Sequence, residues 1–169
     1  MRDRWKLSIA VLLAAAGLTL LMHGVRVEAN STHGEIEAFN QKYIAAHLKM
    51  DNPMVSSFWS EDGVSLLPEM PPLVGKKAID KFFDDAVKPL AGYHMKTMEI
   101  DFREIQLMGD WAYEWGLEHQ VLQPPDGKPV IEGRGNILLI LHKNAQGEWK
   151  IKQEMWNAAP KLAGESKAP

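Results

Sequence analysis

The sequence predicts an α+β fold in which three N-terminal helices pack inside a strongly curved antiparallel sheet, giving a cone-shaped roll. Two observations predict it. Beyond residue 30, the first half of the chain repeats apolar residues at helical spacing, whereas the second half alternates with the period of two that strands require. Four consecutive long strands joined by short turns form a meander, and helices that precede a meander cover one of its faces.

A separate apolar segment opens the chain of 169 residues. Residues 1–6 form a short segment of net positive charge, and residues 7–22 carry no charge. As a helix this run spans about 24 Å, short of the ~30 Å hydrocarbon core of a membrane. We therefore expect residues 1–29 to be a signal peptide cleaved after Ala29. The alternative is an uncleaved N-terminal membrane anchor.

The rest of the chain is expected to lie outside the cytoplasm, exported to the periplasm or secreted. Residues 30–157 form the predicted domain, and residues 158–169 a disordered tail without patterning. After cleavage no stable membrane span is expected.

The composition excludes several classes of partner and cofactor. Cysteine is absent, which excludes disulfides and thiolate sites. After residue 29, 15 Lys and Arg stand against 20 Asp and Glu with no basic run, so no nucleic acid partner is expected. The histidines lack the spacing of a metal site, and no nucleotide-binding loop is present, so neither a metal nor a cofactor is expected.

Three segments have helical patterning. Thr32 and Glu35 give the Thr-x-x-Glu form of a capping box, and apolar residues follow at spacings of three and four until Asp-Asn-Pro at 51–53. A short second helix is expected at 54–59. Between residues 76 and 90 apolar residues fit positions i, i+3, i+4, i+7 and i+8, which predicts the third helix.

Strands make up the remainder. A short strand is expected at 64–67, after a turn at 61–63. Four long strands are predicted at 95–107, 111–122, 130–142 and 149–157, separated by Gly- and Pro-containing turns. Such strands exceed the usual length of ~5–6 residues, and long strands in a twisted sheet coil. The coil is expected to enclose an apolar, aromatic-lined pocket.

Several strings in this layout are similar to one protein family. They are Phe-Trp-Ser-Glu-Asp-Gly-Val at 58–64, Gly-Lys-Lys-Ala-Ile at 75–79, Gly-Asp-Trp-Ala-Tyr-Glu-Trp-Gly at 109–116, Gly-Glu-Trp-Lys-Ile at 147–151 and Trp-Asn at 156–157. On these strings, residues 35–157 resemble the nuclear transport factor 2-like superfamily, and within it the SnoaL-like branch of unknown function. The superfamily includes ketosteroid isomerase, polyketide cyclases, dehydratases and non-catalytic modules. The resemblance implies the cone-shaped fold and a homodimer formed through the sheet.

Two positions bear on the isomerase mechanism. Tyr43 matches the tyrosine that helps to hold an oxyanion in the isomerase. The catalytic base of that enzyme stands just before a proline on the first strand, where this chain has Leu67 before Pro68. Since leucine cannot abstract a proton, the steroid isomerase mechanism is disfavoured.

The candidate site consists of side chains expected to face the pocket. Tyr43 and His47 lie four residues apart on the apolar face of the first helix, and with Glu114 they are the candidates for catalysis. The alternative is that Tyr43 and His47 are core residues satisfied by backbone carbonyls. The predicted pocket-lining residues are Tyr43, His47, Phe58, Trp59, Leu67, Phe83, Met98, Trp115, His119, Arg134 and Asn157.

The sequence leaves alternatives for which face of each strand points into the pocket. On 111–122 the face of Trp115 and His119 is preferred, the alternative being the face of Ala112, Glu114, Gly116 and Glu118, since a shift of one residue inverts the alternation. Glu132, Arg134 and Asn136 would orient a polar ligand group, or form a solvated face or a cross-strand ion pair. Gln153, Met155 and Asn157 form the corresponding face of the last strand.

Three functions stay open. The first is binding of a small apolar or aromatic ligand. The second is an isomerase, cyclase or dehydratase that uses Tyr43 and His47 as acid and base without a cofactor, and the third is a dimerising interaction module without catalysis. A histidine or carboxylate of perturbed pKa beside an open cavity would favour the enzyme, and its absence would favour the binding protein.

Overall fold

The computed structural model describes residues 32–125 and 127–160. The expected signal peptide, its cleavage at Ala29 and residues 161–169 of the expected tail lie outside these residues. The tail was predicted to begin at 158, but Ala158 belongs to the last strand and the Ala159 N–H donates to the Arg134 carbonyl oxygen over 2.9 Å. Within them, no helix has the length and apolar character needed to cross a membrane. The first helix occupies residues 32–48, and from Ala38 it belongs to the unit that holds the sheet. The other elements are α2 (Asn52–Ser57), β1 (Trp59–Leu66), β2 (Leu73–Val74), α3 (Lys76–Val87), the 3₁₀ helix η1 (Lys88–Leu90), β3 (His94–Met108), β4 (Trp111–Gln123), β5 (Ile131–Lys143) and β6 (Trp149–Ala158).

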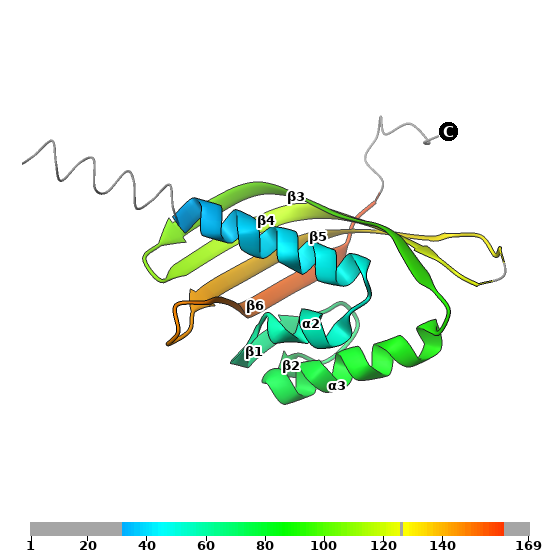
Figure 1. Ribbon diagram of the computed structural model, residues 1–169, viewed down its shortest axis with the longest axis horizontal. Helices are drawn as coiled ribbons and strands as arrows, with labels where there is room; N and C mark the ends of the chain where they lie inside the picture. Colours follow the sequence, from blue (N-terminus) through cyan, green and yellow to red (C-terminus); the bar gives the residue numbers. More distant parts are fainter. Residues whose placement is uncertain (1–31, 126, 161–169) are drawn as a thin grey trace, which may run out of the picture. The chain divides into compact units, whose positions relative to one another are not determined.

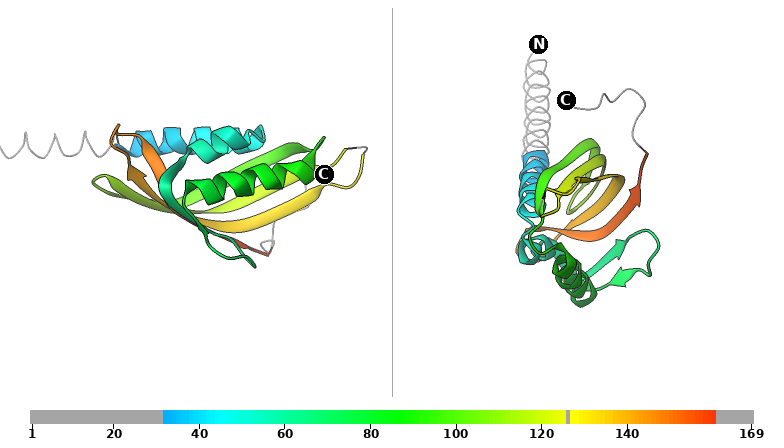
Figure 2. Two further views of the ribbon diagram at one scale, coloured as in Figure 1. Left: turned by 90° about the horizontal axis from the view of Figure 1, so that it is seen from below. Right: turned by 90° about the vertical axis from the view of Figure 1, so that its right-hand side faces the viewer.

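The strands form one six-stranded sheet in the order β2-β1-β6-β5-β4-β3. The sheet is curved, and the helices of this unit lie on its concave side (Figures 1 and 2). The predicted meander from β3 to β6 is antiparallel throughout. The expectation of a wholly antiparallel sheet is wrong, because β1 pairs with β6 in parallel. Hairpin turns fix the direction only of consecutive strands, and β1 and β6 are separated by the whole meander.

The region between α2 and β1 differs from the prediction. The short helix begins at Asn52, where the Asp51 side chain accepts a hydrogen bond from the Met54 N–H, 3.1 Å away. The predicted turn at 61–63 lies inside β1, as a bulge in the pairing with β6. Gly63 permits this bulge, since a Cβ there would lie 2.9 Å from the Trp59 ring.

The interior face of β4 is the one that carries small and acidic residues. Ala112 and Glu114 are fully buried and Glu118 nearly so, whereas Trp115 is 39% exposed. The preferred inward face, that of Trp115 and His119, is therefore wrong. A Cβ at Gly116 would lie 2.8 Å from the Asp101 carbonyl oxygen, so the small residues on the inner face let neighbouring β3 bend close over β4.

The core lies between the helices and the concave face. The fully or almost fully buried aliphatic side chains include Ile79 of α3, Ile137, Leu139 and Leu141 of β5, and Ile151 of β6. Phe58 packs its ring edge-on against Phe39 and Tyr43, with centroids 5.2 and 5.6 Å away. This packing holds Tyr43 in place beside the cavity described next.

Candidate functional site

A cavity of about 320 Å³ lies between the helices and the concave face of the sheet. Most of its wall is apolar, and the rings of Tyr43, Phe82, Phe83 and Trp156 line it. Polar groups reach it from the first helix, β1, β4 and β6. An apolar cavity with a few polar groups is the usual form of a small-molecule site.

Glu154 of β6 is a buried acid on this wall. Ser65 Oγ donates a hydrogen bond to its Oε2 over 2.8 Å, and the Tyr43 hydroxyl approaches its Oε1 at 3.4 Å. Burial, opposed by the Ser65 hydrogen bond and assisted by the nearby Glu118 carboxyl, raises the pKa of Glu154 to about 7. Near neutral pH this side chain can therefore both accept and donate a proton.

Tyr43 keeps its own proton. Burial, followed by the neighbouring carboxyls, holds the pKa of Tyr43 well above its usual value of 10.0. The hydroxyl is consequently a hydrogen-bond donor at any physiological pH.

Glu118 of β4 is the second acid on the wall. Trp156 Nε1 donates to its Oε1 over 3.0 Å, and Gln120 Nε2 donates to the same oxygen. Burial raises the pKa of Glu118 as well, although these two donors oppose the shift.

His47 completes the set of titratable side chains on the wall. Its Nδ1 lies 2.9 Å from the Tyr43 carbonyl oxygen, which can only accept, so Nδ1 carries the proton and Nε2 keeps a lone pair. Burial lowers the pKa of His47. The imidazole is therefore neutral at neutral pH and available as an acceptor.

The structure brings five of the predicted pocket-lining residues together around the cavity: Tyr43, His47, Leu67, Phe83 and Met98. Phe58 and Trp59 are buried but are not on the wall, because Phe58 fills the space beside the rings of Phe39 and Tyr43. Glu114 is also off the wall, where the Asn40 side chain donates to it over 2.7 Å.

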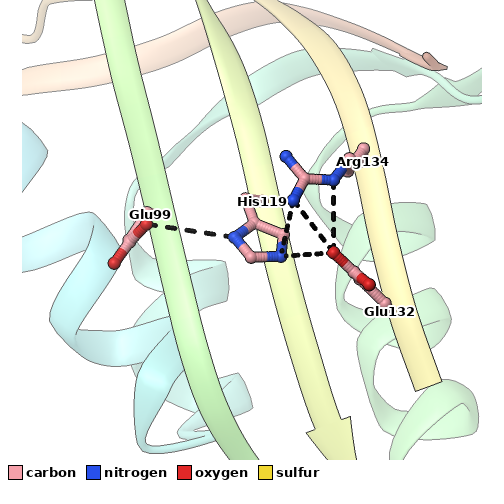
Figure 3. Close-up of polar contacts among 4 residues, drawn as sticks. All are labelled: Glu99, His119, Glu132 and Arg134. Carbon is pink, nitrogen blue, oxygen red and sulfur yellow. Dashed lines mark hydrogen bonds and ion pairs between the residues drawn. The ribbon is translucent and has the colours of Figure 1, made fainter. Parts of the chain in front are cut away.

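The remaining predicted lining residues, Trp115, His119, Arg134 and Asn157, are not on this wall. Their strands pair in a register that puts them on the convex face, opposite the inward residues of β4. Figure 3 shows His119 and Arg134 in a cross-strand cluster with Glu99 and Glu132. Arg134 Nη2 and His119 Nε2 lie 2.9 and 3.0 Å from the same Glu132 oxygen, and His119 Nδ1 lies 3.9 Å from Glu99. Arg134 and Glu132 therefore pair within β5, and the contacts that cross to neighbouring strands are those of His119.

A wider hollow of about 550 Å³ adjoins this cluster, lined largely by side chains of both charge signs. Asp101 and Arg103 pair there at 2.8 Å. In this hollow the charged side chains pair with one another, whereas the inner cavity has a mostly apolar wall with few polar groups. We therefore take the inner cavity as the site.

Sequence reasoning did not select Ser65, Glu118, Glu154 or Trp156 as site residues. On β6 a bulge opposite Ile140 and Leu141 shifts the alternation, so that Ile151 and Glu154 are both buried although they are three residues apart. The face of Gln153, Met155 and Asn157, of which Asn157 is a predicted lining residue, therefore points outward. The signal for Glu118 in the sequence is its place on the alternative inward face of 111–122, which it shares with Ala112, Glu114 and Gly116.

The packing of Trp156 on Gly135 gives a test of the cavity wall. A Cβ at Gly135 would overlap the Trp156 indole, which must then move away from Glu118. We expect Gly135→Ala to lower the free energy of unfolding by about 1–3 kcal/mol and to shift the Trp156 indole N–H resonance. At Gly133, two residues away, the nearest atom would be 3.9 Å from the new Cβ, so Gly133→Ala is the matched control. Equal stability of the two variants in urea unfolding would contradict this packing.

No family model matches the chain, and neither does any curated protein. Solved structures do. A ketosteroid isomerase-like protein from Erwinia carotovora atroseptica has 22% identity and a TM-score of 0.64, over 76% of this chain and 96% of that one. A nuclear transport factor 2-like protein with a cystatin-like fold from Novosphingobium aromaticivorans has 16% identity and a TM-score of 0.63, over 83% and 90%. A Catenulispora acidiphila protein in complex with S-DNPA has 13% identity and a TM-score of 0.59, over 76% and 94%. The fold expected from the sequence is confirmed.

Proposed function

Because the chain has the nuclear transport factor 2-like fold, which it shares with a ketosteroid isomerase-like protein and with a protein in complex with S-DNPA, we propose that it is an acid–base enzyme. It moves a proton on a small, largely apolar molecule bound in the inner cavity. The observation that supports this proposal is Glu154, a buried carboxyl on an apolar wall, in contact with Ser65 and Tyr43. Among the functions open from the sequence, a carboxyl of perturbed pKa beside a cavity favours the enzyme.

The side chains suggest how such a step would run. The Glu154 carboxylate takes a proton from a carbon of the ligand, and the electron pair of that C–H bond moves toward an adjacent oxygen-bearing group. Tyr43, which keeps its proton, donates a hydrogen bond to the charge that develops there. Glu154 then returns the proton at the same or a second carbon. Since Leu67 stands where the isomerase has its base, the base in this proposal comes from the last strand instead.

The test is hydrogen–deuterium exchange on the ligand rather than turnover of an unknown substrate. Small cyclic and aryl ketones with acidic α-hydrogens are incubated in D₂O with the protein, and deuterium incorporation is followed by NMR. We expect Glu154→Gln to lower the exchange rate by about 100-fold or more, with circular dichroism unchanged. Glu99→Gln, an exposed carboxyl on β3, is the control.

Two outcomes are informative against the proposal. Equal exchange by Glu154→Gln and the parent chain would exclude Glu154 as the base. Ketones that bind in the cavity without any exchange would favour the binding protein expected from the sequence.

We also propose that the protein is exported and that it forms a homodimer through the convex sheet face. The basic start and short apolar run before Ala29 support export. Mass spectrometry of the protein from cell fractions tests for a chain beginning at Asn30.

The dimer is supported by Trp111, Trp115 and Met155, since their large apolar side chains are 39–47% exposed. Sedimentation of Trp115→Glu against the parent chain tests the dimer.

A further inference from the structure

The inner cavity has an unbalanced set of ionisable groups. Glu118 and Glu154 line it, at 6% and 9% exposure. Among the described residues of its wall there is no lysine or arginine. The remaining base there, His47, is buried and holds its Nδ1 proton against a backbone carbonyl. On the inner side, a positive charge beside these two acids can therefore come only from the ligand, although Glu118 also borders the outer hollow that contains Arg103 and Arg134.

We propose that the molecule bound in the inner cavity carries a protonated amine, which pairs with Glu118. This inference rests on the proposed function, since it uses the same cavity. It assigns different roles to the two carboxyls: Glu118 binds the ammonium group and Glu154 moves the proton.

The geometry of Glu118 supports this division. Within the part of the chain that the structure describes, its hydrogen bonds from Gln120 and Trp156 both fall on Oε1. The second oxygen, Oε2, is thus the one that can accept from a ligand. On Glu154, in contrast, Ser65 contacts one oxygen and Tyr43 approaches the other.

The walls suit a cation that bears an apolar body. The rings of Tyr43, Phe82, Phe83 and Trp156 line the cavity, and the face of an aromatic ring attracts an ammonium group that has lost its water. A carboxylate or phosphate would find no lysine or arginine on this wall to pair with, so anionic ligands are expected to bind here most weakly.

The test compares three probes of nearly the same size and different charge. They are phenethylamine, phenethyl alcohol and hydrocinnamate, and their dissociation constants are measured by titration calorimetry near neutral pH. We expect the amine to bind about tenfold or more tightly than the alcohol, because a charge-assisted hydrogen bond replaces a neutral one. Hydrocinnamate is expected to bind most weakly.

Two variants locate the effect. Glu118→Gln keeps the size and an acceptor for Trp156, so the alcohol should bind as before, while the amine loses its preference to within about twofold of the alcohol. Glu99→Gln changes an exposed side chain of β3 and should retain the full preference for the amine over the alcohol.

The outcomes separate this inference from the proposed function. If the alcohol binds the parent chain as tightly as the amine, or hydrocinnamate binds more tightly than either, the inference is overturned. Loss of ketone exchange in Glu154→Gln would still stand in that case. Retention of the amine preference in Glu118→Gln, or binding of none of the three probes, overturns it as well.

Discussion

The free energy of unfolding of this protein is expected to fall as the pH rises from about 4.5 to about 7. Burial raises the pKa of both Glu114 and Glu154 from 4.5 to about 7. Between these values the folded chain binds more protons than the unfolded chain, so stability decreases with pH. The contribution of each carboxyl is fully present below the unfolded pKa and is lost as the pH passes through the folded one. A pKa difference of this size corresponds to roughly 3 kcal/mol for each carboxyl.

Other groups modify the size of this effect. Burial raises the pKa of Glu118, which therefore acts in the same direction. Burial lowers the pKa of His47 from 6.5, so that the folded chain binds less of its proton and the sign is opposite below about that pH. Three carboxyls against one imidazole leave a net loss of stability toward neutral pH.

Urea unfolding followed by tryptophan fluorescence, at several pH values between about 5 and 8, measures this dependence. Glu154→Gln and Glu114→Gln should each flatten it, because each removes one of the raised carboxyls. Glu99→Gln should leave it unchanged, since that side chain is 75% exposed. Stability that is constant or rises over this range would show that the carboxyls are not held protonated by burial.

The long strands and α3 could be predicted because their signals are local. Turn residues bracket the four strands of the meander, and both ends of each observed strand lie within one residue of the prediction. The helical period from residue 76 likewise gives α3. Features that depend on which distant strands become neighbours were not predicted, as the parallel pairing of β1 with β6 shows.

The inward faces of the strands were harder to predict, because in the site the most hydrophobic side chains are not always the buried ones. On β4 a large aromatic, Trp115, points outward, where its indole N–H donates to Glu104 over 3.2 Å, and two acids point inward. A pattern argument places the tryptophan inside, since burying an acid normally costs free energy. On β6 the bulge then inverts the alternation without any glycine or proline to signal it. Local rules are expected to fail where a site requires buried polar groups.

Glu114→Gln is expected to stabilise the protein at mildly alkaline pH. Asn40 Nδ2 donates to Glu114 Oε2 over 2.7 Å, while Glu114 Oε1 and Asn40 Oδ1 are buried acceptors that have no hydrogen-bond partner within residues 32–125 and 127–160. A glutamine replaces one carboxyl oxygen by an NH₂ group, which can donate to Asn40 Oδ1 while the remaining oxygen still accepts from Asn40. Asn40 Oδ1 then gains a donor, the unpaired carboxyl oxygen is replaced by that donor, and the buried negative charge is removed.

Satisfying buried polar groups is worth about 1–3 kcal/mol, so we expect a gain of that order in the free energy of unfolding near pH 8. The gain should shrink near pH 5, because Glu114 is then protonated and can itself donate to Asn40. Asn40→Leu in the Glu114→Gln background should remove the gain by leaving the glutamine without its partner. A loss of stability in Glu114→Gln at alkaline pH would mean that the carboxyl is ionised and favourably paired in the folded protein, against the burial that the structure shows.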